Sequence, residues 1–249
     1  MGEKENQSQN DEALLDSLGQ IILASGDYYI LRGSVSDAVI GVLQKHSDYV
    51  AAKFRSRLGS VDSLSLPHLI ASLSDAPVHV ARIYNFIFTR SLVNGSIDET
   101  ESPKILNSSP SNLLTIFRTT CDDLKINVEE NPQLPSCLQV GQHIRSQRID
   151  AFVTHKSTTE QYEDFSRLRN RATLFGQPFN LWLERGGFTF SQTSDGAKIL
   201  AYLVTLCLRD VVDCALFNRQ RFGIDLFSQV TAIELQQASS VLRKMKEYL

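Results

Sequence analysis

The chain has 249 residues, of which 42% are hydrophobic and 21% charged, a composition that fits a folded globular protein and excludes general disorder and fibrous architectures. Its formal net charge of −3 argues against a protein that wraps nucleic acid, because such proteins carry a strong basic excess. No apolar run reaches the ~20 residues of a membrane helix, and the polar first ten residues do not resemble a leader peptide. We therefore expect an intracellular globular chain without a membrane partner, in which residues 1–10 are disordered.

The first helical pattern covers residues 11–25, where leucines and isoleucines recur at steps of three and four. A longer pattern starts at Ser34, and Gly59 can end it about seven turns later. A short helix follows with Pro67 in its first turn, where the missing N–H of proline is not needed, and a further helix completes this part. We assign these elements to a first folded unit, residues 11–93. Its expected core residues are Val39, Leu43, Val50 and Phe54.

Residues 94–137 interrupt this regular pattern. The segment is rich in Asn, Ser and Pro, and it carries 3 basic and 7 acidic residues. Such a composition predicts an acidic linker, with one short helix at about residues 111–124. Its two acid pairs, Asp122–Asp123 and Glu129–Glu130, are either solvated charges or an acidic patch that binds a partner.

From residue 138 the same order of elements recurs. A short helix has Pro178 near its start and Gly186–Gly187 at its end, where a glycine cap is favoured over a phosphate-binding loop. Asp195 opens a second long helix with a wide apolar face, and a last helix completes the second unit, residues 138–249. Strand-like alternation is absent, so the sequence predicts an all-α protein. The expected core residues of this unit are Trp182, Leu200, Leu203, Cys207, Val211 and Cys214.

The repeated order of short, long and short helix has a physical consequence. Such a unit cannot bury its apolar stripes alone, because the short helices flank the long one in an open arrangement. Two units in one chain can cover each other, and the linker keeps the second unit at a high effective concentration. The alternative is a generic helical bundle with a similar order of helices. Trp182 is likewise either a core residue or a contact for a neighbouring subunit.

Several segments carry a resemblance to a known family. They are Leu64–Ile70 and Ala76–Tyr84 in the first half, and Tyr162, Phe165, Arg169, Phe179, Trp182, Ile199–Leu203 and Val230–Ala238 in the second. Through them, residues 12–91 and 160–247 resemble the histone folds of the suppressor-of-Ty protein three family, the SAGA coactivator subunit that faces TBP. The two halves of that family are similar in turn to TBP-associated factors thirteen and eleven, which form a pair in TFIID.

The resemblance implies an all-α fold with two histone folds in one chain that form an intramolecular handshake pair. It further implies a non-catalytic nuclear subunit of a SAGA-like coactivator, which scaffolds the histone-fold core and engages TBP for transcription initiation by RNA polymerase II. The expected partners are TBP and other histone-fold subunits, with no cofactor and no direct DNA binding. The basic excess of the second half predicts a surface for an acidic partner at Arg167, Arg169, Arg171 and Arg185.

Two other classes stay open at this stage: a DNA-binding histone-fold pair, and an unrelated all-α interaction or nucleocapsid-like protein. No catalytic or metal-binding motif is evident, since the four cysteines fit no zinc-ligand spacing and are expected to be reduced core residues. We expect His46 and His68 to be structural. Lys53, Arg55 and Arg57 end the first long helix, and we expect them to be solvated and to interact with the helix dipole rather than with phosphate.

Overall fold

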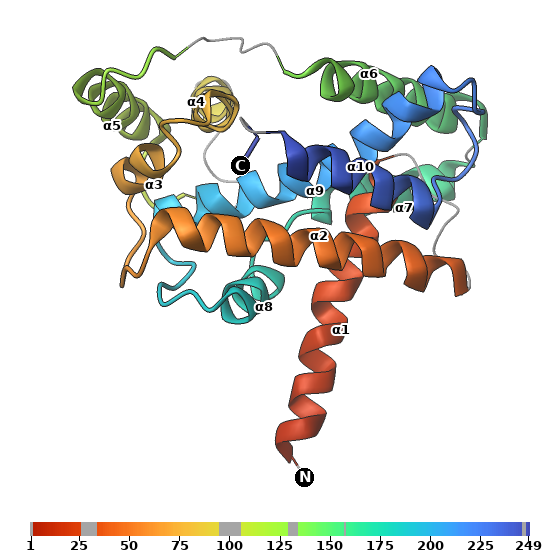
Figure 1. Cartoon of the computed structure of the whole chain (residues 1–249), viewed down its shortest axis with the longest axis horizontal. Coiled ribbons are helices and arrows are strands. Elements are labelled where there is room, and N and C mark those ends of the chain that lie inside the picture. Colours follow the sequence, from red (N-terminus) through yellow and green to blue (C-terminus); the bar gives the residue numbers. More distant parts are fainter. Residues whose placement is uncertain (1, 26–33, 95–105, 129–133, 157, 246–247) are drawn as a thin grey trace.

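In its described residues the chain consists mainly of helices (Figure 1). The computed structural model describes residues 2–25, 34–94, 106–128, 134–156, 158–245 and 248–249. Within these ranges there is no strand, so the all-α prediction is confirmed. None of the helices in this part of the chain combines the length and apolar character that crossing a bilayer requires.

The first half contains five helices in its described part. They are α1 (Gly2–Leu23), α2 (Ser34–Leu58), α3 (Leu66–Ser72), α4 (Pro77–Asn94) and α5 (Pro110–Asp123). Helix α2 begins at Ser34 as predicted, and Gly59 follows its end with a φ of 65°, a left-handed conformation that glycine adopts at low cost. Pro67 lies in the first turn of α3, where the side chain of Ser65 accepts a hydrogen bond from the amide of His68.

The second half consists of five α-helices and one π-helical turn in its described part. Its elements are α6 (Ser136–Ala151), the π-helical turn η1 (Phe152–Lys156), α7 (Thr159–Arg171), α8 (Gln177–Gly186), α9 (Asp195–Arg221) and α10 (Ala232–Lys244). Helix α8 ends in the predicted glycine cap, since Gly187 has a φ of 67° and its amide bonds back into the last turn. Helix α10 opens with a reciprocal capping box between Thr231 and Glu234.

Helices α2 and α9 run in opposite directions through the middle of the molecule (Figure 1). Helix α2 packs against α8 and α10 from the second half, and α9 packs against α1 and α3 from the first half. The loop that follows α2 meets the loop that precedes α9, because Thr189 Oγ1 donates to Val61 O at 2.7 Å and Ser194 Oγ donates to Leu64 O at 2.6 Å. Each long helix is therefore covered by helices of the other half.

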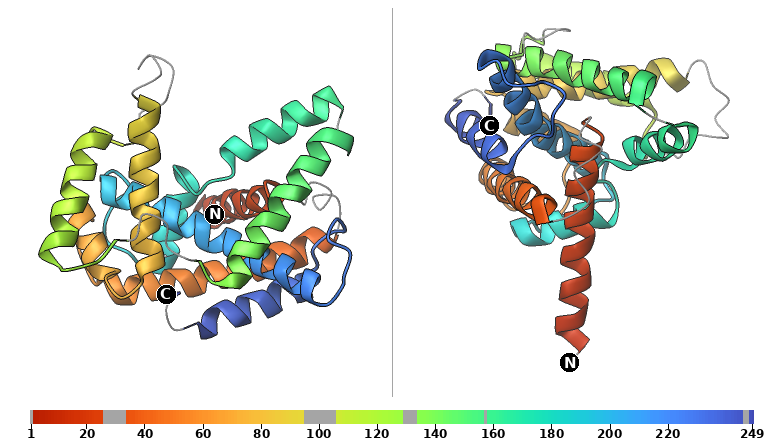
Figure 2. Two further views of the ribbon diagram at one scale, coloured as in Figure 1. Left: turned by 90° about the horizontal axis from the view of Figure 1, so that it is seen from above. Right: turned by 90° about the vertical axis from the view of Figure 1, so that its right-hand side faces the viewer.

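One continuous hydrophobic cluster extends through both halves. All ten residues predicted to be in the core are buried in it, and Trp182 stacks on Phe179 and Phe188 with ring centroids 5.6 and 5.1 Å away. The four cysteines are free thiols and buried, as expected. A smaller cluster of Ile149, Phe152 and Phe165 holds α6, η1 and α7 together at the side of the molecule (Figure 2).

Two segments of the chain differ from what the sequence led us to expect. Helix α1 begins at Gly2, so residues 2–10, predicted to be disordered, are helical and extend away from the body (Figure 2). Once the buried part of α1 is formed, adding residues to its end avoids the cost of helix nucleation. The helix expected within the linker is present as α5. It packs on the first half, because Leu113, Phe117 and Cys121 are buried against α3 and α4.

Two helical glycines make a matched test of the packing between α6 and α9. A Cβ at Gly141 in α6 would lie 1.9 Å from the carbonyl oxygen of Asp213 in α9, whereas a Cβ at Gly41 in α2 would meet nothing within 4 Å. We expect Gly141→Ala to lower the free energy of unfolding by about 2–3 kcal/mol through overpacking. Gly41→Ala should raise it by about 0.5–1 kcal/mol because alanine favours the helix. Urea unfolding measures both, and a neutral Gly141→Ala would contradict the close approach.

Candidate functional site

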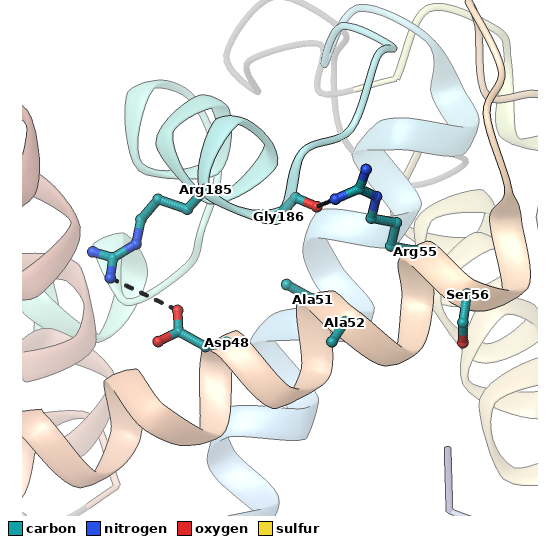
Figure 3. Close-up of a pocket in the computed structure, with 7 residues that line it drawn as sticks. All are labelled: Asp48, Ala51, Ala52, Arg55, Ser56, Arg185 and Gly186. Carbon is teal, nitrogen blue, oxygen red and sulfur yellow. Dashed lines mark hydrogen bonds and ion pairs between the residues drawn. The ribbon is translucent and has the colours of Figure 1, made fainter.

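A surface pocket of about 740 Å³ lies where the last turn of α8 crosses α2 (Figure 3). Helix α2 supplies five lining residues and α8 supplies two, and together they are Asp48, Ala51, Ala52, Arg55, Ser56, Arg185 and Gly186. The five positions on α2 are separated by steps of three, one, three and one, so they form a single stripe along that helix. The pocket therefore has a floor of small side chains with a charged residue toward each end.

Glycines at the end of α8 allow the two helices to come close. A Cβ at Gly186 would lie 3.2 Å from the Cβ of Ala51 and even closer to the ring of Phe188. A Cβ at Gly187 would lie 2.5 Å from Nη1 of Arg55, so the guanidinium group rests directly on this residue. The glycine pair that caps the helix thus also seats an arginine from the neighbouring helix.

The two arginine side chains of the pocket are each held by a neighbouring group. Arg55 Nη1 donates to the carbonyl oxygen of Gly186 at 3.2 Å and so neutralises the carbonyl end of α8. Arg185 pairs with Asp48 at 3.8 Å, a separation too long for a good hydrogen bond. With the Gln44 amide oriented toward Arg185, its oxygen accepts from both terminal guanidinium nitrogens, at 2.9 and 2.6 Å. Two cations and one carboxylate leave the pocket with a net positive charge.

The lining groups suit binding rather than bond making. Ser56 is the lining hydroxyl, and it donates to the backbone oxygen of Lys53 at 2.8 Å. The lining carboxylate, Asp48, lies about two turns away on α2 and pairs with Arg185, so it is not placed to activate Ser56. Within the described part of the chain, no group of three His, Cys, Asp or Glu residues is placed to hold a metal ion. The guanidinium groups of Arg185 and Arg55, at opposite ends of the small apolar floor, can each bind an acidic group by charge-assisted hydrogen bonds.

The predicted arginine surface is divided between two helices. Arg185 lies on α8 and lines the pocket, whereas Arg167 lies on α7, which packs against α1. The side chains of Arg169 and Arg171 lie outside the described side chains, although their backbone belongs to α7. Whether these arginines bind an acidic partner stays a prediction.

The basic cluster at the end of α2 is more involved in packing than predicted. Arg57 donates to Ser72 O at 3.2 Å and pairs with Asp75, which ties α2 to the turn after α3. Arg55 bonds to α8, and Lys53 lies 5.8 Å from the ring of Tyr49. Arg55 and Arg57 therefore join α2 to neighbouring elements, whereas the contact of Lys53 with Tyr49 stays within α2. Of the predicted acidic patches, Asp122 and Asp123 are exposed, and Glu129–Glu130 lie outside the described residues.

A buried polar network joins the two halves in the core. Arg82 in α4 makes two hydrogen bonds of 2.8 and 2.7 Å to the carboxylate of Asp210 in α9. Tyr248 donates its hydroxyl to the same carboxylate at 2.5 Å, and its backbone oxygen accepts from Nε2 of His79. Desolvation would favour the neutral guanidine, but the charge of Asp210 outweighs it and keeps the pKa of Arg82 above its ordinary value. The network therefore holds residue 248 against α4 and α9.

Two buried histidines are neutral at physiological pH. Burial lowers the pKa of His79 to about 4, with the charge of Arg82 adding to the shift. Burial also lowers the pKa of His46 to about 4, with a smaller contribution from Arg243, and His46 Nδ1 lies 2.9 Å from Ser239 Oγ. His68 is partly buried, and its Nε2 lies 3.0 Å from Leu58 O. All three histidines make structural hydrogen bonds, as expected for His46 and His68.

Comparisons with known proteins return no relative. No family model, curated protein or solved structure matches the chain.

The buried histidines predict that acid weakens the fold. Between pH 6.5 and about 4 the unfolded chain binds protons on His46 and His79 while the folded chain does not, so stability falls as the pH is lowered through this range. Asp213 opposes this in part, because burial raises its pKa to about 6 and the folded chain binds that proton more readily. We expect a net loss of about 1–2 kcal/mol between pH 7 and pH 5.

The variant His79→Gln keeps a side-chain donor for Tyr248 O but removes the titrating group. In this variant His46 still titrates, but Asp213 offsets most of its effect, so the loss of stability between pH 7 and pH 5, measured by urea unfolding at each pH, should become much smaller. A pH dependence equal to that of the unchanged chain would show that His79 titrates normally in the fold.

Proposed function

We propose that the chain is a non-catalytic nuclear subunit of a SAGA-like transcription coactivator, built from two histone folds that pair within one chain. The observation that carries this proposal is the reciprocal packing of the two halves. One unit consists of α1, α2 and α3, and the other consists of α8, α9 and α10. Each has the order short helix, long helix and short helix, apart from the N-terminal extension of α1.

The geometry around the two long helices supports a handshake pair. Helices α8 and α10 cover α2, while α1 and α3 cover α9, so the two units exchange equivalent contacts. The start of α9 lies beside the loop after α2, since a Cβ at Gly196 would meet Leu64 O at 2.3 Å. Near the middle of α2, Arg243 of α10 donates to Lys45 O at 2.9 Å. Helices α4 to α7 are additions outside the two three-helix units.

The surface of the second unit supports a role in assembly. Exposed apolar side chains occupy the loop before α10 and the outer side of α10, and they include Phe222, Ile224, Ile233 and Val241. Two buried arginines fix this loop: Arg219 donates to Ser228 O at 2.6 Å, and Arg148 donates to Leu226 O at 2.5 Å. An ordered loop with exposed apolar side chains is typical of a protein contact surface.

The alternative of a DNA-binding pair has less support from the described surface. Basic residues at the end of α2 are engaged by other elements, with Arg57 bound to Asp75 and Arg55 bound to Gly186. The whole chain is acidic at −3, which disfavours attraction to phosphate.

Purification of the tagged full chain from its own cells tests the proposal. We expect other histone-fold subunits of a coactivator to be identified in stoichiometric amounts by mass spectrometry, and purified TBP to bind the chain directly. Recovery of the chain alone, or with proteins unrelated to transcription, would contradict the proposed function. Strong binding to duplex DNA at physiological salt without TBP binding would favour the DNA-binding pair.

A matched pair of variants tests the apolar surface in the same experiment. Ile233→Asp places a charge on α10 at a side chain that is 68% exposed, and Leu124→Asp does the same after α5 at one that is 43% exposed. We expect Ile233→Asp to reduce co-purification of the other subunits by about tenfold or more if it lies in a contact, while Leu124→Asp changes it little. Equal recovery with both variants would exclude this surface from the assembly.

A further inference from the structure

Two of the buried cysteines, Cys137 and Cys214, meet where α6 packs against α9. The helices are in close contact there, because a Cβ at Gly141 would lie 1.9 Å from the carbonyl oxygen of Asp213. Cys137 lies one turn before Gly141 on the same face of α6. Cys214 follows Asp213 on α9, and its thiol is in hydrogen-bonding contact with that of Cys137. Two thiols in contact across closely packed backbones are the arrangement from which a disulfide forms.

Cys137 is the more reactive thiol of the two. It lies in the first turn of α6, where the backbone N–H groups favour a negative charge. Its sulfur accepts hydrogen bonds from the Cys214 thiol, from its own amide and from the amide of Leu138, and these bonds lower the pKa of Cys137 despite burial. The thiolate, which is the form that attacks oxidants, is therefore favoured at Cys137.

Cys214 has the opposite character. It donates its S–H to Cys137, and this bond together with burial raises the pKa of Cys214 far above its ordinary value. Cys214 is also fully buried, so an oxidant in solution does not reach it directly. Cys137 is 7% exposed and follows the exposed residue Ser136, which gives a small oxidant access from the start of α6. The pair thus combines one reactive thiol with one shielded thiol in contact with it.

We propose that Cys137 and Cys214 are a peroxide-sensitive thiol pair, which hydrogen peroxide converts into a disulfide that links α6 to α9. The Cys137 thiolate attacks one peroxide oxygen, so that an S–O bond forms, the O–O bond breaks and the leaving hydroxide takes up a proton to become water. The sulfur of Cys214 then loses its proton and attacks the sulfenic sulfur of Cys137. The S–S bond forms, the S–O bond breaks, and hydroxide leaves with that proton as a second water. The two thiols lose two electrons in total, and the site stands apart from the proposed coactivator function.

The other two buried cysteines, Cys121 in α5 and Cys207 in α9, are internal controls. Burial raises the pKa of Cys121 to about 11 and that of Cys207 to about 12. Both thiols therefore stay protonated at pH 7 and should react slowly with peroxide. Cys121 is 3% exposed, a burial similar to that of Cys137, so a difference in their reactivity would reflect the thiolate rather than access alone.

Peroxide treatment of the folded full chain at pH 7, followed by mass spectrometry, tests the proposal without any substitution. The remaining thiols are alkylated in denaturant, and trypsin then releases each cysteine in a peptide of its own. We expect the peptides of Cys137 and Cys214 to be recovered as one linked species that dithiothreitol separates, while those of Cys121 and Cys207 are recovered alkylated. The link should form at least about tenfold faster than either control thiol is oxidised. The four peptides, in chain order, are residues 119–125, 126–145, 199–209 and 210–219.

Two serine variants separate the roles of the thiols. Cys214→Ser keeps a hydroxyl donor for the Cys137 thiolate but removes the second thiol, so the sulfenic acid should persist. Dimedone, which reacts with sulfenic acids, should then label Cys137 at least about tenfold more than in the unchanged chain, whereas Cys121→Ser should alter neither the labelling nor the link.

The linked peptides of the unchanged chain decide the question even if a variant does not fold. Absence of the link between Cys137 and Cys214, or links to Cys121 or Cys207 in similar amounts, would overturn the proposal. Dimedone labelling of the folded Cys214→Ser variant that is equal at Cys121, Cys137 and Cys207 would overturn it as well.

Discussion

The mutual burial of α2 and α9 is the constraint on which the rest of the structure depends. Each long helix has an apolar face wider than its own short helices can cover, and the uncovered part is buried only when the helices of the other half pack on it. One continuous core therefore replaces two separate ones. The positions of the two loops, of α8 against α2, and of the pocket between them all follow from this arrangement.

Polar groups inside this core limit how the halves can fit together. The Arg82–Asp210 pair is almost fully buried and joins α4 of the first half to α9 of the second. Removing one partner of such a pair would leave a buried charge without compensation, which is strongly unfavourable. The pair therefore disfavours packings that would separate α4 from α9, while the apolar contacts supply most of the stabilising free energy.

Much of the fold could be predicted because its signals are local. Gly59, Pro67 and Gly187 act at helix ends through their own backbone conformations, and the spacing of residues such as Leu43 and Leu203 shows which face is buried. The buried ion pair between Arg82 and Asp210 could not be predicted in the same way. The sequence shows an Asp within an apolar helix face, but it does not show which distant Arg pairs with it. The helical start of α1 was missed since polar residues carry little periodicity.

The candidate site was predictable only in part for a similar reason. Arg185 was singled out through the local density of arginine, but its neighbours Ala51 and Ala52 carry no chemical signal, and Arg55 was expected to serve its own helix. A pocket made by crossing helices depends on where the helices meet. The signal available in the sequence was one face of α2. The five lining positions on that face, from Asp48 to Ser56, hold small or charged residues and no large apolar one.

Cleavage of the chain between Val128 and Leu134, which lie between α5 and α6 in the sequence, tests most directly whether the two halves share one core. A protease site inserted there would separate α1–α5 from α6–α10. The shared core predicts that the two fragments stay together as a 1:1 complex in size-exclusion chromatography, and that each fragment alone lacks a cooperative thermal transition. A fragment that is monomeric and unfolds cooperatively by itself would contradict the shared core.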